Sequence, residues 1–550
     1  MLKLVSSRRT CSLVLCALLA ANLALEADTW ADPPRVGEPY ELLGKRLVFT
    51  NWIYVRPGDV GWTDPQGQSV FADESVKMGP FDAVWAPSDH LPWGIQLMAQ
   101  PPAEIRKWEI KPEFPWEGGD IDVTAILWED GKLKAWGNCA AGSCYFESRD
   151  GFVWERPKLG LVEYQGSKEN NLIPSRPPGH VFIDPTSTEE RYKCVWVAED
   201  SMTLEELEAF KKRHPDRWGS RVQRTVNGKP YIVCLWGWVS PDGFHWSKLP
   251  EPVLMDHTDS YNIGYYDPRL KKYVVYVRTW DALERAPSLP VEEGRWDYWL
   301  PNARRSIGRS ETDDFRSFPL SEMILQPTPE MEPADDLYYN CFTWIPGAEH
   351  NLLMFPTVRH LRDDTTSVWL ASSSNGKLWH WVPGGKTLVE TGPYGAWNGG
   401  CIWPHPPLFE LGDGSFALQI RGDNFPHKYP RGLRKIEIGL AIWPHGRIMA
   451  LRAPERGEFG TVAIVAPSSK LYLNARTKRA GSVRVAAQYG QRGADIIPGR
   501  EFENSIPIVG DQPHAPVTWK DAQDLGVKPG EPVILLFKME LAEIFALEFE

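Results

Sequence analysis

Carboxylates recur at one level of a repeated strand–turn–strand pattern in this chain of 550 residues. Counting eight residues back from the turn gives Asp122 and Asp259, and a looser register places Asp336 at the same level. Glu199 returns to this level on a second strand, and Asp120 shares a strand face with Asp122 because side chains alternate with period two. Converging carboxylates supply a general acid, a base and a nucleophile. We therefore predict a catalytic set and one substrate-binding neighbour: Asp122, Asp259, Asp336 and Glu199, with Asp120.

Arginines lie at the same level, where the second strands of three repeats end. They are Arg278, Arg359 and Arg421. A guanidinium binds a carboxylate or a sulfate through two parallel N–H groups, so these three could clamp an acidic ligand. They could also pair with the nearby aspartates as structural salt bridges, and the two roles are compatible.

Five further residues complete the predicted substrate-binding set. They occupy the same level in other repeats or offer an aromatic face to a sugar: Arg176, His180, His405, Trp116 and Trp403. His257, Asp259 and His405 could also gather at this level, but they lack a compact metal-ligand motif. We therefore predict no metal site and no cofactor.

Five strand–turn–strand units must position these residues. Asp-Gly or Asp-Pro marks most of the turns, and both pairs favour tight hairpins. The five units span Asp120–Trp136, Gly179–Val197, Asp259–Arg278, Asp335–Arg359 and Trp403–Arg421. We interpret the aspartates of the turns themselves as structural: Asp130, Asp184, Asp267 and Asp413.

A second motif, Ser-x-Asp/Asn-Gly-x-x-Trp, interleaves with these units at Ser148–Trp154, Ser240–Trp246 and Ser373–Trp379. Successive hairpin turns lie about 55 to 85 residues apart, which leaves room for about four strands in each gap. Four-stranded sheets repeated radially are the blades of a propeller. We therefore predict an all-β fold, a five-bladed β-propeller followed by a C-terminal β-sandwich. Repeated turn chemistry in an ordinary sandwich is the alternative.

Composition divides the chain into four segments. We predict a signal peptide over 1–27, a β-rich lead-in over 28–117, the propeller over 118–456 and the sandwich over 457–550. Of the 26 tryptophans, only Trp519 lies in the last segment, where strands alternate cleanly. The one strong helix candidate is Thr203–His214, which begins with a Thr-x-x-Glu capping box.

Charge and the N-terminus restrict partners and location. A formal charge of −12 argues against nucleic acid as a partner, because phosphate binding requires a basic face. Three basic residues precede the apolar stretch Cys11–Leu25, which is too short to span a bilayer comfortably. We therefore expect a secreted or periplasmic protein with no membrane partner after signal cleavage; the oligomeric state stays open.

The hairpins, the Ser-x-Asp-Gly turns and the trailing β-segment together resemble the five-bladed propeller glycoside hydrolases of families 32 and 43. The stretch Ser148–Ile173 is especially similar to exported bacterial proteins of the family 32 type. The resemblance implies three acidic residues, one from each of the first three blades, and Asp122 matches the first of them. It also implies a carbohydrate substrate and hydrolysis of glycosidic bonds.

The leading hypothesis is therefore a secreted glycoside hydrolase that cleaves a poly- or oligosaccharide. Two carboxyl groups must flank the scissile bond. We assign Asp122 as base or nucleophile with Asp259 tuning it, and Asp336 or Glu199 as the acid. Two alternatives remain: a sialidase-like hydrolase that grips acidic sugars through its arginines, and a propeller that binds carbohydrate without catalysis.

Overall fold

The computed structural model describes residues 37–57, 91–119, 121–200, 203–217, 223–226, 229–256, 258–281, 303–428, 432–491 and 495–550. Within them the fold is all-β, as predicted, with α2 (Leu204–Arg213) as the α-helix. The predicted capping box is present: the Thr203 side chain accepts from the backbone of Glu206, whose own side chain accepts in return. No helix in the described part of the chain is long and apolar enough to cross a membrane. The predicted signal peptide lies outside these residues.

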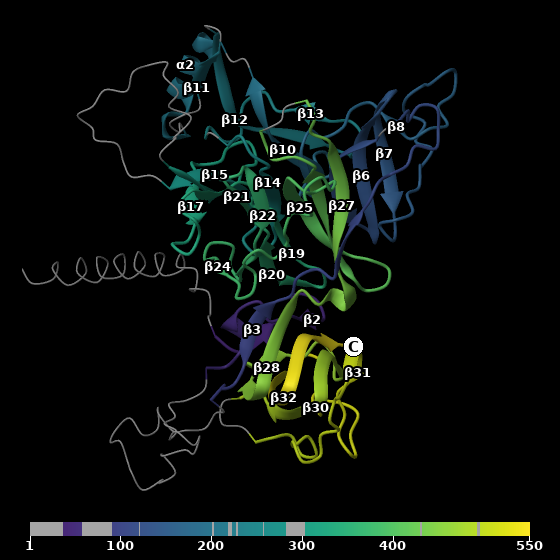
Figure 1. Cartoon of the computed structure of the whole chain (residues 1–550), viewed down its shortest axis with the longest axis vertical. Helices are drawn as coiled ribbons and strands as arrows, with labels where there is room; N and C mark the ends of the chain where they lie inside the picture. The colour runs from purple at the N-terminus through teal and green to yellow at the C-terminus, as the bar shows by residue number, and fades with distance from the viewer. Residues whose placement is uncertain are drawn as a thin grey trace, which may run out of the picture.

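Three consecutive sheets begin at the first three predicted hairpins (Figure 1). The first contains β5 (Asp122–Glu129), β6 (Lys132–Cys139), β7 (Gly142–Ser148) and β8 (Leu172–Ile173). The second contains β9 (His180–Ile183), β10 (Tyr192–Asp200), β12 (Lys229–Ser240), β11 (Gln223–Val226) and β13 (Ser247–Lys248). The third contains β14 (Ile263–Asp267), β15 (Lys272–Asp281), β16 (Arg304–Thr312) and β17 (Glu322–Leu325).

The fourth predicted hairpin is divided between two small sheets. One contains β18 (Asp335–Leu337), β21 (Thr357–His360) and β22 (Thr365–Val368). The other contains β19 (Phe342–Ile345), β20 (Ala348–Met354), β23 (Ala371–Ser373) and β24 (His380–Trp381). The chain leaves the extended conformation between β18 and β19, where Cys341 has a φ of 42°. The hairpin therefore breaks into two pairings.

The fifth sheet takes its outer strand from a distant part of the sequence. Its strands are β25 (Cys401–Glu410), β26 (Phe416–Asp423), β27 (Ile436–Trp443) and β4 (Glu104–Lys107). β4 belongs to the predicted lead-in, yet it pairs with β27 from Glu104↔Ile442 to Lys107↔Gly439. This pairing ties the two ends of the sheet-forming region together.

The first strands of the sheets lie next to one another around a common space. β5 lies beside β9, β9 beside β14, β19 beside β25, and β25 beside β5. The ring centroids of Tyr265 on β14 and Phe342 on β19 stack at 4.6 Å, so β14 also lies beside β19 and the ring of five strands is complete. All five strands line one cavity of about 310 Å³. The sheets are therefore arranged radially about this cavity.

The Ser-x-Asp/Asn-Gly motifs connect neighbouring sheets. In the copy after β12, the Ser240 hydroxyl accepts from Gly243 N at 3.0 Å, and Gly243 has a φ of 81° that favours glycine. The buried Gly243 carbonyl accepts the indole N–H of Trp136 from the preceding sheet at 2.7 Å and that of Trp246 at 2.8 Å. Gly376 likewise accepts from Tyr276 and Trp379 at 3.0 Å. Part of the tryptophan excess therefore fastens one sheet to the next.

The C-terminal strands form an eight-stranded sheet, at the bottom of Figure 1. They are β28 (Met449–Gly460), β29 (Ile464–Val465), β30 (Leu471–Tyr489), β31 (Asp511–Pro516) and β32 (Pro532–Phe549). Three short strands from the predicted lead-in complete it: β1 (Tyr40–Glu41), β2 (Arg46–Leu47) and β3 (Gln96–Ala99). The lead-in is thus shared between this sheet and the fifth one.

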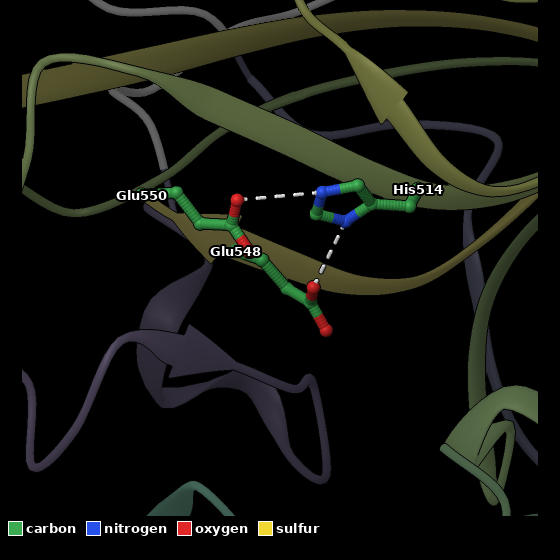
Figure 2. A group of neighbouring side chains, drawn as sticks. All are labelled: His514, Glu548 and Glu550. Carbon is green, nitrogen blue, oxygen red and sulfur yellow. Dashed lines mark hydrogen bonds and ion pairs between the residues drawn. The ribbon is translucent and has the colours of Figure 1, made fainter. Parts of the chain in front are cut away.

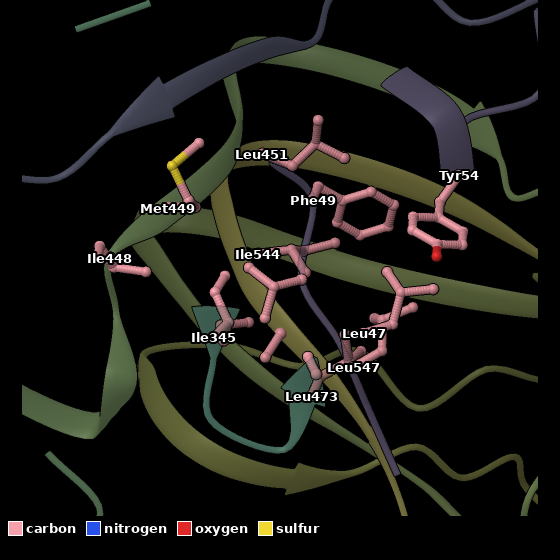
Figure 3. Close-up of a cluster of buried hydrophobic side chains, with 14 of the residues drawn as sticks. Leu47, Phe49, Tyr54, Ile345, Ile448, Met449, Leu451, Leu473, Ile544 and Leu547 are labelled. Atoms are coloured by element: carbon pink, nitrogen blue, oxygen red, sulfur yellow. The ribbon is translucent and has the colours of Figure 1, made fainter. Parts of the chain in front are cut away.

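One apolar core joins the C-terminal sheet to the sheets above it. Figure 3 shows side chains from the N-terminal segment, from β19 and from the C-terminal strands packed together, including Phe49, Ile345, Leu473 and Ile544. Each of these four is at most 1% exposed. The two parts of the molecule therefore share buried apolar surface, which favours a fixed contact between them.

Candidate active site

Part of the predicted set lies together at the end of the sheets where the first strands begin, which we call the mouth: Asp259, Arg278, Asp336 and Arg359 lie around Tyr338. Asp122 opens β5, Asp259 lies just before β14, and Asp336 lies in β18. Arg278 and Arg359 lie near the mouth ends of β15 and β21. Asp122 and Asp259 thus lie at strand starts, and Arg278 and Arg359 lie on returning strands.

Asp259 and Arg278 form an ion pair at the mouth. The carboxylate Oδ1 contacts guanidinium Nη1, and the side chain of Asp259 is 36% exposed whereas that of Arg278 is 1% exposed. Burial lowers the pKa of Arg278 to about 10, against the opposing influence of Tyr338. Within the described residues, Nε and Nη2 of Arg278 have no hydrogen-bond partner. These two atoms form the edge that binds a carboxylate or sulfate bidentately.

Tyr338 is the centre of a cluster of three arginines. The guanidinium carbon of Arg278 lies 4.5 Å from its ring centroid, that of Arg305 lies 5.2 Å away and that of Arg359 lies 5.8 Å away. The phenol oxygen lies 3.3 Å from Nε2 of His427. Cation–π contacts of this kind hold the guanidinium groups in place.

Asp336 is buried behind this cluster. Its carboxylate pairs with Arg305, and the two side chains are 2% and 4% exposed. The neighbouring Asp335 contacts Nδ1 of His360 at 3.0 Å, and Nε2 of that histidine lies 2.9 Å from Ser367 Oγ. Asp336 is therefore positioned to hold Arg305 rather than to touch a ligand directly.

Arg359 is held by a carboxylate that the sequence reasoning missed. Its Nε donates to Oδ1 of Asp364 at 3.0 Å, and the other carboxylate oxygen accepts from Lys428 N at 2.6 Å. Asp364 thus links the turn after β21 to the loop after β26. Arg359 is 2% exposed, so this pair lies largely inside the wall of the mouth.

Arg421 belongs to a separate pair in the fifth sheet. Its Nη2 lies 3.6 Å from Oδ1 of Asp423, and Nη1 of Arg434 lies 3.8 Å from Oδ2. Asp423 Oδ2 also accepts the indole N–H of Trp403 at 3.0 Å. Each of the three predicted arginines therefore has an aspartate nearby, in agreement with the structural role left open above.

Asp122 is exposed at the first residue of β5. It lies opposite Asn138, whose side-chain amide donates to Asp122 Oδ2 at 3.5 Å. The amide oxygen of Asn138 accepts from Nε of Arg176 at 2.6 Å. Arg176 therefore reaches the level of Asp122 through one intervening side chain.

The two predicted histidines are kept neutral by burial. Burial lowers the pKa of His180 to about 4 and that of His405 to about 3. His405 Nδ1 donates to the carbonyl of Trp403 at 3.1 Å, and its ring meets that of Tyr261 at 4.6 Å. His180 lines the central cavity described above. Neither can supply a positive charge to a ligand at neutral pH.

The predicted aromatic platforms are packed rather than open. Trp403 is 2% exposed, and its ring lies 5.0 Å from that of Tyr339. Trp116 stacks on Phe114 at 4.6 Å and donates its indole N–H to Asn171 at 2.7 Å. Both rings therefore serve mainly in packing.

Two predicted residues have no described side chain. Glu199 lies on β10 opposite Val233 of β12, and only its backbone is described. Asp120 lies outside the described residues. Their roles stay predictions.

Four residues of the mouth were not singled out from the sequence: Arg305, Tyr338, Asp364 and His427. Arg305 lies at the start of β16, a third strand, whereas the register argument followed only the first two strands of each unit. Tyr338 lies two residues after the predicted Asp336, and this closeness in sequence was the signal that could have identified it as a residue of the mouth. Asp364 and His427 lie in loops whose course no strand periodicity predicts.

The described residues contain one group of three potential metal ligands, and it is remote from the mouth in sequence. Figure 2 shows His514 between Glu548 and Glu550 at the C-terminal sheet. Nδ1 of His514 lies 3.2 Å from Glu548 and Nε2 lies 3.5 Å from Glu550. The imidazole also stacks on Tyr472 at 4.2 Å. Both ring nitrogens are thus already engaged with carboxylates, as in an exposed ion-pair cluster.

No protein-family model matches this chain, and no curated protein matches it. Solved structures do match. An N-acetylgalactosamine deacetylase from F. plautii is 12% identical with a TM-score of 0.36, covering 63% of this chain and 95% of that one. An endo-arabinase from Bacteroides thetaiotaomicron is 11% identical with a TM-score of 0.32, covering 63% and 96%.

A GH32 β-fructofuranosidase from Bombyx mori is also similar, at 9% identity and a TM-score of 0.33, over 81% of this chain and 94% of that one. Matches to glycoside hydrolases of families 43 and 32 thus recur among the solved structures. Identities and TM-scores this low say nothing about the activity of this chain.

Proposed function

We propose that residues 104–443 form a five-bladed β-propeller and that the C-terminal strands fold as a sandwich packed against it. We propose further that the chain is a glycoside hydrolase that cleaves a poly- or oligosaccharide at the mouth. The radial arrangement of five first strands around one cavity supports the propeller. The carboxylates at the mouth support the chemistry.

The observation that carries this function is the environment of Asp259. Its carboxylate is 36% exposed, so a ligand can reach it, while its partner Arg278 is 1% exposed and fixed against Tyr338. A charge-assisted bond from a buried guanidinium stabilises the negative carboxylate and orients it. An oriented, accessible carboxylate is suited to act as a base or as a nucleophile.

Asp122 is the second accessible carboxylate of the mouth. It is exposed, and among the described residues its hydrogen-bond partner is a neutral amide at long distance, so a substrate can reach it. We assign it as the proton donor to the leaving oxygen, in place of the base or nucleophile role expected from the sequence. Asp259 then attacks the anomeric carbon or activates a water. Asp336 acts as a positioning residue through Arg305, because it is too buried to meet the substrate. Glu199 stays an alternative acid.

A product screen against neutral, uronic and sulfated polysaccharides tests this function. The wild-type chain should release sugar from at least one of them. Asp259→Asn and Asp122→Asn should each lower the rate by about 100-fold or more, the usual scale for loss of an acid or base. Asp130→Asn is the matched control, because Asp130 is an exposed turn residue with a φ of 53° that asparagine tolerates.

Two results would contradict the assignment. Equal rates for wild type, Asp122→Asn and Asp259→Asn would show that neither carboxylate is catalytic. Glycan binding that persists in both variants, without turnover by wild type, would favour a non-catalytic carbohydrate-binding propeller. Export is proposed separately, and a mature N-terminus near residue 28 in the extracellular or periplasmic fraction would support it.

A further inference from the structure

The cavity inside the ring of first strands extends from His180 and Ile263, the first residues of β9 and β14, to the hairpin turns. It encloses about 310 Å³ and is lined by β5, β9, β14, β19 and β25 together with the turn from Pro346 to Glu349. Its volume falls at the lower end of the about 300–1,000 Å³ typical of small-molecule sites. Neither Asp122 nor Asp259 lines it. We call it the turn-end cavity.

Two tryptophans of the turn-end cavity differ from most others in the chain. Trp128 is 38% exposed and Trp344 is 37% exposed. Trp136 and Trp379, in contrast, are at most 8% exposed and donate their indole N–H groups to glycine carbonyls. Within the described residues, neither Trp128 nor Trp344 has an acceptor for its N–H group. Both therefore offer a ring face and a free donor to a ligand.

The deeper walls of the turn-end cavity are apolar. Ile126, Phe182, Ile263 and Leu408 contribute to them, and each is at most 5% exposed. His180 and Thr343 are polar exceptions, and Nδ1 of His180 has no hydrogen-bond partner among the described residues. A purely apolar ligand would leave this atom and the two indole N–H groups unsatisfied, which costs free energy.

The charges at the rim argue against an anionic ligand. Glu349 and Glu410 line the cavity, and Glu410 is paired with Arg46, whose Nη1 lies 3.3 Å from Oε2. The same Nη1 donates to the Pro346 carbonyl at 3.0 Å. The carboxylate of Glu349, which has no ion-pair partner among the described residues, repels an anion, and Arg46 adds no net positive charge because it is already paired with Glu410 and Glu548. A neutral ligand with hydroxyl groups avoids this repulsion and, unlike a cation, can accept from the indole N–H groups.

We propose that the turn-end cavity binds the neutral ring of a sugar, separately from the mouth. A sugar ring has an apolar C–H face that suits the indole rings of Trp128 and Trp344. Its hydroxyl edge can accept from their N–H groups and donate to Glu349. This binding needs no catalysis at Asp259, so it holds whether or not the chain hydrolyses glycosidic bonds.

Calorimetric titration of the full chain with neutral methyl glycosides and oligosaccharides tests the proposal. At least one of these sugars should bind the wild-type chain. Trp344→Ala and Trp128→Ala should each weaken binding about tenfold, because each removes a stacking face. Both side chains are partly exposed, so the thermal melting temperature should change little. Trp93→Ala is the matched control, since Trp93 is 49% exposed and does not line the cavity.

Asp259→Asn separates this cavity from the mouth and should bind the sugar as tightly as wild type does. Three results would overturn the proposal. They are the absence of binding by every neutral sugar, unchanged binding in both tryptophan variants, and binding of tetramethylammonium in place of sugars. Weaker binding in Asp259→Asn with unchanged tryptophan variants would place the ligand at the mouth and would also overturn it.

Discussion

The mouth and the turn-end cavity are built on the same first strands, yet their chemistry differs. The mouth is lined by ion pairs, among them the buried pair Asp336–Arg305 and the more exposed pair Asp259–Arg278. The turn-end cavity is lined by aromatic and aliphatic side chains, with Trp128 and Trp344 at its rim. The charged groups of the mouth come from returning strands and loops, whereas the cavity is built mostly from the repeated first strands. Specificity at the mouth therefore depends on the least repetitive parts of the chain.

The largest expected effect is a difference in the free energy of unfolding between two tryptophan variants, one at the mouth and one at the turn-end cavity. Trp403→Ala should lower the free energy of unfolding by about 3–5 kcal/mol, because it empties a fully buried site and also removes the N–H donor to Asp423. Trp344→Ala should change it much less, because that ring is already 37% exposed. Urea unfolding of both variants measures the difference, and similar losses would contradict the distinction between a packed and an open aromatic.

Removing one carboxylate from the mouth and one from the turn-end cavity should give a smaller difference in the free energy of unfolding. Asp336→Ala should cost about 3 kcal/mol, near the lower end for breaking a buried ion pair, because Arg305 keeps its contacts with Trp280 and Tyr338. Glu349→Ala removes an exposed carboxylate and should cost about 0.5 kcal/mol or less. Equal midpoints in urea for the two variants would show that the mouth does not depend on its buried charges.

The smallest effect concerns the pH dependence of stability. His405 has a pKa of about 3 in the folded chain and about 6.5 in the unfolded chain. Between these two values the unfolded state therefore binds a proton at His405 that the native state does not bind. The free energy of unfolding should therefore fall as the pH decreases from about 6.5 toward 3. His405→Asn should reduce this fall between pH 7 and pH 5. If the pH dependence of unfolding is the same in His405→Asn as in wild type, the assignment of a buried, neutral imidazole on β25 is wrong.

Features that depend on neighbouring residues were predictable from the sequence. The hairpins turn at Asp130-Gly131 and at Asp267-Pro268, and the helix after Thr203 begins with its capping box. Turn and cap preferences are local, because they arise from backbone dihedral angles and short side-chain hydrogen bonds. The same register placed Asp259 and Arg278 at one level, where they form an ion pair.

Long-range partners came only from the tertiary structure. Pairing of β4 with β27 joins residues more than 300 positions apart, and the ring of Tyr338 gathers arginines from three different strands. The sequence determined most of the strands and turns and placed Asp122 and Asp259 at strand starts. The tertiary structure decided which of them are buried, as for Asp336, and which are open, as for Asp259. The physical reason is that exposure depends on every side chain packed around a residue, and most of those neighbours are distant in sequence.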